Sequence, residues 1–143
     1  MNESSDLNAL VGTATGGGDM TDEDMTLTLL RDGGSVTVVV SGEIDLMTVA
    51  RLSDTLSSEM TKAPAVLIVD LEGVGFLASM GITALALADR EAGEKGVDFR
   101  VVASGRCILR PLQITGMTDL LDVYASRGAA LSSVGASRSP QGD

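Results

Sequence analysis

The sequence predicts a single α/β domain with a mixed β-sheet and the element order β-β-α-β-α-β-α-β. A length of 143 residues suits one domain, and an apolar fraction of 44% is ample for a core. A two-strand pattern comes first, and segments of strand and helix character then alternate. Such alternation implies parallel strands joined by right-handed crossovers.

A hairpin is predicted at the start of the domain. Met25–Leu30 alternates as a half-buried strand does, and Ser35–Ser41 is rich in β-branched residues. The intervening Asp32-Gly33-Gly34 is typical of a tight turn, because glycine adopts positive φ without strain. Gly42 ends the second strand.

An amphipathic helix is predicted from Thr48 to about Lys62, because apolar residues recur there at steps of three and four. Thr48 is a suitable N-cap, and Ala63-Pro64 ends the helix. The apolar run Val66–Leu71 is typical of a strand covered on both faces, and we expect a loop after it.

The second helix is predicted over Ser79–Lys95, with Gly96 ending it. Its first two turns are apolar nearly all round and its second half is polar, so it leaves the core toward solvent. Phe99–Ala103 is expected to be a further buried strand, and Asp122–Ala125 a brief edge strand.

A third, short helix is predicted over Ile108–Thr115, closed by Gly116. Pro111 interrupts this pattern, and a proline inside a helix costs about 3 kcal/mol. We therefore expect the helix to start near Arg110, which places Pro111 in its first turn.

Two tails are expected to flank the domain, which then spans residues 25–133. Residues 1–24 hold six acidic and no basic residues, without sustained apolar periodicity, and predict a disordered acidic tail. Residues 134–143 predict a second, small-residue tail. Gly12–Gly17 matches only the first half of a phosphate-binding loop, since no Lys-Ser/Thr pair follows, and is interpreted as linker.

Composition excludes several classes of site and partner. The chain has no histidine and one cysteine, which excludes a Ser-His-Asp triad, a His-ligated zinc and an internal disulfide. A net charge of −10 argues against binding nucleic acid or anionic lipid. Residues 1–24 lack the basic and apolar regions of a signal peptide, and no apolar run is long enough to span a membrane, so we expect neither a signal peptide nor a membrane span. We expect a cytoplasmic protein without a metal or cofactor.

The most informative stretch is Leu71–Ile82. A buried strand ends there, a glycine-containing segment follows, and Ser79 stands at the start of a helix. Taken alone, Ser79 is most simply interpreted as an N-cap, since serine is among the best capping residues.

Two motifs point further. Gly42-Glu43-Ile44-Asp45 precedes the first helix, and Gly73-x-x-Phe76-Leu77-x-Ser79-x-Gly81 precedes the second. Together with the element order, the strand Val66–Leu71 and the later Gly116-Met117, this pattern resembles the anti-sigma factor antagonists of the STAS-domain family. The resemblance covers about Met25 to Ala125 and implies a STAS-like fold.

The resemblance implies a protein-binding module and not an enzyme. Such antagonists bind a serine-kinase-type anti-sigma factor and so free a sigma factor for RNA polymerase. The anti-sigma factor supplies ATP to phosphorylate a serine, which disrupts the complex, and a serine phosphatase reverses the change. The family's usual pattern is Asp-Ser-Ser-Gly, and its acceptor falls on Ser79; here Ala78 replaces the Asp and Met80 the second Ser.

Candidate contacts with the partner lie near Ser79, because helix starts and loops at one sheet edge form a shared surface. They are Glu43, Asp45, Met47, Thr48, Met80 and Gly81. A methionine at a helix start is adaptable enough for a protein contact.

Two alternatives remain open from the sequence. One is a STAS module that is not phosphorylated and is controlled by abundance or by oxidation of Cys107, which lies near Arg106 and Arg110. The other is a small enzyme that uses carboxylates such as Asp45 and Asp70 for acid–base catalysis.

Overall fold

The computed structural model describes residues 25–132. The two expected tails and the Gly12–Gly17 run lie outside the described residues, as does Ser133 at the expected end of the domain. Five strands and five helices are described. In chain order they are β1 (Met25–Asp32), β2 (Ser35–Ile44), α2 (Val49–Thr61), β3 (Val66–Leu77), α3 (Ser79–Lys95), β4 (Asp98–Val102), α4 (Arg106–Ile114), α5 (Met117–Leu120), β5 (Asp122–Tyr124) and α6 (Arg127–Ser132).

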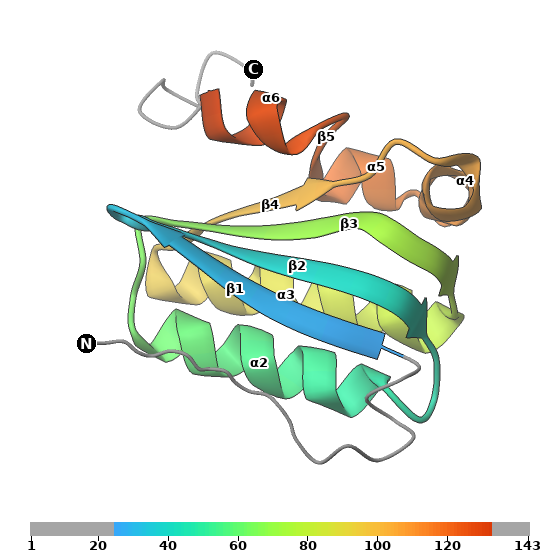
Figure 1. The fold of residues 1–143 in the computed structure, drawn as a ribbon, viewed down its shortest axis with the longest axis horizontal. Helices are drawn as coiled ribbons and strands as arrows, with labels where there is room; N and C mark the ends of the chain where they lie inside the picture. The colour runs from blue at the N-terminus through green and yellow to red at the C-terminus, as the bar shows by residue number, and fades with distance from the viewer. Residues whose placement is uncertain (1–24, 133–143) are drawn as a thin grey trace.

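The predicted mixed sheet is confirmed. Its strands lie in the order β1-β2-β3-β4-β5, with β1 antiparallel to β2 and every later pair parallel (Figure 1). The hairpin turns at Gly33-Gly34, where Asp32 pairs with Ser35 and Gly33 has a φ of 61°. Every strand therefore pairs with the strand before it in the sequence.

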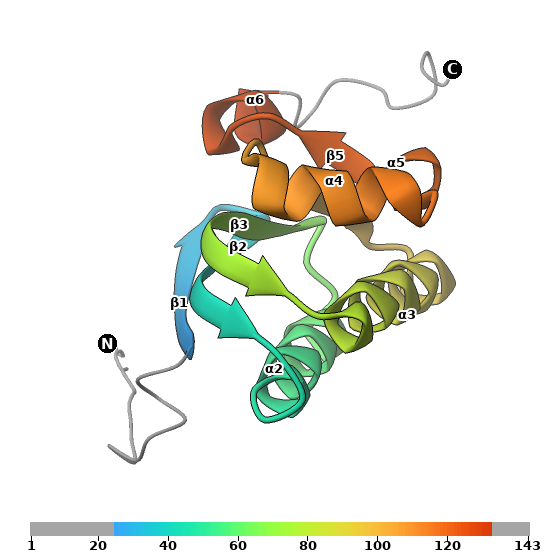
Figure 2. The ribbon, with the colours of Figure 1, turned by 90° about the vertical axis from the view of Figure 1, so that its right-hand side faces the viewer.

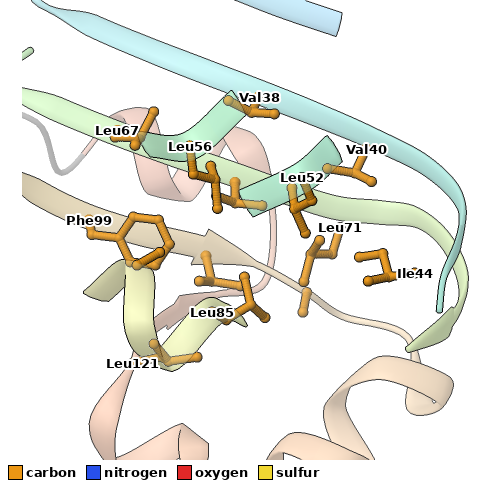
Figure 3. Close-up of a cluster of buried hydrophobic side chains, with 14 of the residues drawn as sticks. Val38, Val40, Ile44, Leu52, Leu56, Leu67, Leu71, Leu85, Phe99 and Leu121 are labelled. Atoms are coloured by element: carbon orange, nitrogen blue, oxygen red, sulfur yellow. The ribbon is translucent and has the colours of Figure 1, made fainter. Parts of the chain in front are cut away.

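The main core lies on one face of the sheet. Alternate residues of β2, β3 and β4 pack there against α2, α3 and α4, and Figure 3 shows Leu52, Leu56 and Leu85 of the helices against Leu71 and Phe99 of the strands. Figure 1 shows α2 and α3 side by side beneath the sheet. This single layer of buried aliphatic side chains holds both helix starts at one edge of the sheet.

The opposite face carries α6, which lies across the sheet from α2 and α3 (Figure 1). A small cluster of Val66, Ile68, Val102 and Ala130 is buried there. The rest of the attachment is polar. Arg100 is 1% exposed and donates to the Ala130 carbonyl oxygen at 2.7 Å, and Arg127 donates to Asp70 at 2.8 Å. Burial opposes the charged form of Arg100, but its hydrogen bond to Asp98 helps to raise the pKa of Arg100. The guanidinium of Arg100 therefore stays charged.

Three expected boundaries were wrong. Gly42 does not end the second strand, because β2 continues through it to Ile44 and stays paired with β3. The segment Glu72–Leu77 is not a loop but the continuation of β3, paired with the end of β2 through two register shifts. A side chain at Gly73 would have its Cβ 3.0 Å from the Ser41 hydroxyl oxygen and 3.2 Å from the Val40 carbonyl oxygen, so glycine here permits close strand pairing.

The third helix also begins earlier than expected. It starts at Arg106, and Pro111 lies inside it instead of in its first turn. Two elements were not predicted at all, the one-turn helix α5 and the six-residue α6. Both are too short for their sequence periodicity to be read.

One ion-pair group in the fold makes stability depend on pH. Glu59 is buried on α2, where burial favours its neutral form, but hydrogen bonds from Arg31 and Lys62 at 2.8–3.2 Å outweigh this and lower its pKa. A lowered pKa contributes stability that is present above the unfolded-state pKa and is lost as the pH falls through the folded-state pKa.

We therefore expect Glu59→Gln to lower the free energy of unfolding by about 1–3 kcal/mol at pH 7, the usual loss for a charged hydrogen bond. The difference from the unsubstituted protein shrinks as the pH falls below about 4, the usual Glu pKa. Urea unfolding of both proteins at several pH values measures this. A difference that stays constant down to pH 3 would contradict the assignment.

Candidate functional site

The candidate site lies at the sheet edge where β2 and β3 end and α2 and α3 begin, which faces the viewer in Figure 2. The last residues of the two strands, Ile44 and Leu77, are paired. The Ala78 amide then donates to the Ile44 carbonyl oxygen at 2.9 Å. This bond fixes the start of α3 beside the segment that leads into α2.

Ser79 is the first residue of α3, and its side chain is exposed. The N-cap is Ala78 and not Ser79, so the capping interpretation of this serine was wrong. Within residues 25–132 the Ser79 hydroxyl makes no hydrogen bond. An exposed hydroxyl without a structural role at a helix start is free to react or to meet a partner.

The segment between β2 and α2 is held by reciprocal hydrogen bonds. The Asp45 carboxylate accepts from the amides of Met47 and Thr48 at 2.9 and 3.1 Å, and the Thr48 hydroxyl accepts from the Asp45 amide at 2.9 Å. The Asp45 carbonyl oxygen also accepts from the Val49 amide, so Asp45 and Thr48 together hold the chain that leads into α2. In the same segment, the Thr48 hydroxyl donates to the Glu43 carbonyl oxygen at 2.8 Å, which ties this chain to β2.

Thr48 is the N-cap of α2 as predicted, although its hydroxyl bonds backward to the loop and not to the first turn of the helix. Its side chain is fully buried. Thr48 therefore supports the loop from the buried side, and a partner would contact the exposed residues of the loop.

Gly81 is also buried, against the strand ends. A Cβ at this position would lie 2.6 Å from Leu77 Cδ1 and 2.7 Å from Ile44 Cγ2. The absent side chain lets the first turn of α3 approach both strands. Gly81, like Thr48, sets the position of its neighbours.

Four large apolar side chains are exposed at the same sheet edge as Ser79. They are Leu46 and Met47 in the loop, Phe76 on β3 and Met80 on α3, with exposures between 47% and 72%. Glu43, which is exposed, pairs with Phe76 across β2 and β3. We call Leu46, Met47, Phe76, Ser79 and Met80 the Ser79 surface. No pattern in the sequence indicated Leu46 as a contact, and Phe76 stood out only as part of a motif.

Cys107 lies near this edge, in the first turn of α4. It is exposed, and its Sγ is 3.7 Å from the Val74 carbonyl oxygen of β3. The adjoining strand and loop are linked by the Ser104 hydroxyl, which donates to Glu72 at 3.1 Å. Cys107 is thus accessible, next to the strand that carries Phe76.

The carboxylates of the enzyme alternative are not brought together. Asp70 is buried, bound to Arg127, and pairs in register with Val39. Asp45 follows Val39 by six residues, so about 20 Å of strand separates the two carboxylates along the sheet. Across the described part of the chain, no group of three or more acidic or cysteine side chains is placed to hold a metal ion. No helix among residues 25–132 is long and apolar enough to cross a membrane.

Comparison with known proteins matches residues 27–130 to the STAS domain family. The chain is 31% identical over 112 residues to the anti-sigma-F factor antagonist RsfB of Mycobacterium tuberculosis, covering 78% of this chain and 91% of that protein. It is 25% identical over 98 residues to the anti-sigma-B factor antagonist of Listeria monocytogenes, covering 68% and 86%.

Solved structures share the architecture. An anti-sigma factor antagonist from Mycobacterium paratuberculosis matches with a TM-score of 0.73 and 33% identity, over 77% of this chain and 93% of that one. The Bacillus cell fate determinant SpoIIAA, in its phosphorylated form, matches with a TM-score of 0.61 over 76% and 99%. At 17% identity the second likeness concerns the fold alone.

Proposed function

We propose that this chain, which belongs to the STAS domain family, is an anti-sigma factor antagonist. In this role it binds a partner anti-sigma factor and thereby releases a sigma factor. Relatives at about 30% identity that cover most of this chain carry that name, which supports the assignment.

The Ser79 surface is the proposed binding site. The observation that carries this proposal is the group of four large, exposed apolar side chains at the same sheet edge as an unbonded serine hydroxyl. Aromatic residues and methionine are enriched at protein interfaces. In this proposal Met47, Met80, Leu46 and Phe76 contact the partner, Glu43 and Asp45 form the rim, and Thr48 and Gly81 hold the surface in shape.

Phosphorylation of Ser79 by a kinase-type anti-sigma factor is the proposed off-switch. A phosphate there would add about −1.5 to −2 charges at pH 7. The start of α3 tolerates this charge, because the first amides of a helix and its dipole favour an anion. The charged phosphate would not be compatible with burial of the Ser79 surface against an apolar partner. The anti-sigma factor is therefore released while the domain stays folded.

Ala78 and Met80 affect how readily the switch works. Neither offers a polar side chain beside the acceptor hydroxyl, in contrast to the usual Asp-Ser-Ser-Gly pattern. The hydroxyl that accepts the phosphate remains and is exposed. In this proposal the anti-sigma factor supplies the ATP and a serine phosphatase reverses the modification.

Co-purification of the full chain from its own cells tests both levels of the proposal. Mass spectrometry of the captured proteins is expected to identify an anti-sigma factor. Mass spectrometry of the chain itself is expected to find one phosphate on Ser79, in a fraction of the chain that is not bound to this partner. Phe76→Ala loses the partner, whereas Leu87→Ala, at an exposed apolar position about two turns along α3 from Ser79, keeps it.

The outcomes separate the alternatives. Capture of no anti-sigma factor by the unsubstituted chain would overturn the antagonist assignment. Capture of one, with Ser79 unmodified even after incubation with the purified partner and ATP, would instead support a module controlled by abundance or by Cys107. In that case intact mass with and without mild oxidant shows whether the cysteine is involved.

A further inference from the structure

The two edges of the sheet differ in how they are protected. β5 is only three residues long, begins with Asp122 and packs against α6. β1 is eight residues long and pairs only with β2 within the described part of the chain. Figure 1 shows β1 along the open front edge of the sheet. The long edge is therefore the accessible one.

An open edge strand presents unpaired amides and carbonyls that another strand can bind. Proteins usually block such edges with charged residues, proline, bulges or short strands. Met25–Leu30 contains no charged residue, proline or glycine. Leu29 and Leu30 are 38% and 42% exposed and, as neighbours in a strand, point to opposite faces of the sheet. Nothing in Met25–Leu30 discourages pairing.

The charges at the end of β1 are compatible with a second copy. Arg31 donates two hydrogen bonds to Glu59, at 2.8 and 3.1 Å, so its charge is already paired. Asp32 lies at the turn, beyond the neutral stretch. Two copies of a chain with a net charge of −10 repel each other in general. Within Met25–Asp32, two copies of β1 can pair antiparallel without placing like charges directly opposite each other.

We propose that two copies of this chain pair through β1, antiparallel, about a two-fold axis at Leu29. Such a contact is isologous, so it closes after two copies and joins two sheets into one. With Leu29 opposite itself, no charged residue meets another. The remaining pairs are Thr28 with Leu30, Leu27 with Arg31 and Thr26 with Asp32.

The dimer is expected to be weak. Eight residues from each copy are far fewer than the roughly 20–30 residues per side of a standard stable interface. Main-chain hydrogen bonds along the strand provide most of the affinity, as in other strand additions. We expect the dimer to dissociate on dilution. The contact leaves out the residues of the Ser79 surface.

Disulfide trapping tests the register in the full chain with Cys107→Ser. Opposite residues in an antiparallel pair have Cα atoms about 4.5–5.5 Å apart, within disulfide range. Leu29→Cys is therefore expected to form a covalent dimer under mild oxidation. Thr26→Cys is the matched control on the same strand. It would lie about 20 Å from its copy, six residues along the strand, and stays monomeric.

Sedimentation of the full chain over a range of concentrations tests the dimer without a crosslink. We expect a monomer–dimer equilibrium that Thr28→Lys abolishes. Ser58→Lys, which adds a lysine at an exposed site on α2, is expected to leave it unchanged. Thermal unfolding is expected to show both variants folded, and binding of the anti-sigma factor is unchanged by Thr28→Lys. A chain that stays monomeric at all concentrations, or that crosslinks equally at Leu29 and Thr26, would overturn the proposal.

Discussion

Ser79→Asp is expected to weaken binding of the anti-sigma factor by at least a hundredfold while the domain stays folded. A carboxylate at the centre of the Ser79 surface would have to be desolvated against an apolar partner. A loss of ~3 kcal/mol already exceeds a hundredfold change in Kd. The charge does not disturb the fold, because Ser79 is exposed and the first turn of a helix favours an anion.

Titration calorimetry with the purified partner measures this loss, and thermal unfolding checks the fold. Ser58→Asp makes the same chemical change at an exposed site on α2, outside the Ser79 surface, and is expected to bind normally. Ser79→Ala, which removes the acceptor without adding charge, is expected to keep most of the affinity. Normal binding by Ser79→Asp would show that the partner docks elsewhere on the domain.

Gly81→Ala is expected to lower the free energy of unfolding by up to about 2 kcal/mol, because overpacking a core costs about 1–3 kcal/mol and the better helix propensity of alanine offsets about 1 kcal/mol of it. The new methyl group meets Leu77 and Ile44 at 2.6 and 2.7 Å, and both side chains are buried, so they have little room to move. This cost exceeds the gain of up to about 1 kcal/mol from the better helix propensity of alanine. Because the first turn of α3 must shift, partner binding falls as well.

The same substitution later in α3 has the opposite sign. A Cβ at Gly93 meets no atom within 4 Å, so Gly93→Ala is expected to stabilise the protein by about 0.5–1 kcal/mol. Urea unfolding of the two variants side by side therefore separates close packing from helix propensity. Equal stabilisation by both would mean that α3 does not rest on the strand ends as described.

Local patterns were enough to predict most of the fold. The turn at Gly33, the apolar spacing of α2 and the bounds of α3, ended by left-handed Gly96, are all recorded in neighbouring residues. The mixed sheet followed from the order of these elements. The end of β3 could not be predicted this way. Gly73 resembles a loop residue, and only the close approach of Ser41 from β2 shows why a glycine belongs in that strand.

The site was predicted in part. The sequence singled out Ser79 and the segment around Asp45, and the structure brings them to one edge through the bond between Ala78 and Ile44. The sequence did not distinguish the exposed residues of the site from the buried residues that support them. Thr48 is polar yet fully buried, because its hydroxyl is satisfied by the loop that it holds. Leu46 is apolar yet 68% exposed.

The attachment of α6 depends on contacts that no local pattern records. Arg127 and Asp70 are 57 residues apart in the sequence, and Arg100 reaches a carbonyl oxygen 30 residues away. An arginine in the strand run of β4 is unusual for a buried position. That residue and Asp70, in the strand run of β3, were the available signs that something polar must cover this face of the sheet.

The consecutive order of the five strands has a consequence for how the protein is made. Each strand after β1 pairs with the strand translated just before it, so its partner has already been synthesised when it leaves the ribosome. Folding during synthesis proceeds from the N-terminal side. The β1–β2 hairpin is therefore the first strand pair whose two members are both synthesised. α6 follows all five strands in the sequence, so Arg127 reaches the ribosome exit only after Asp70 and the rest of the sheet have been translated.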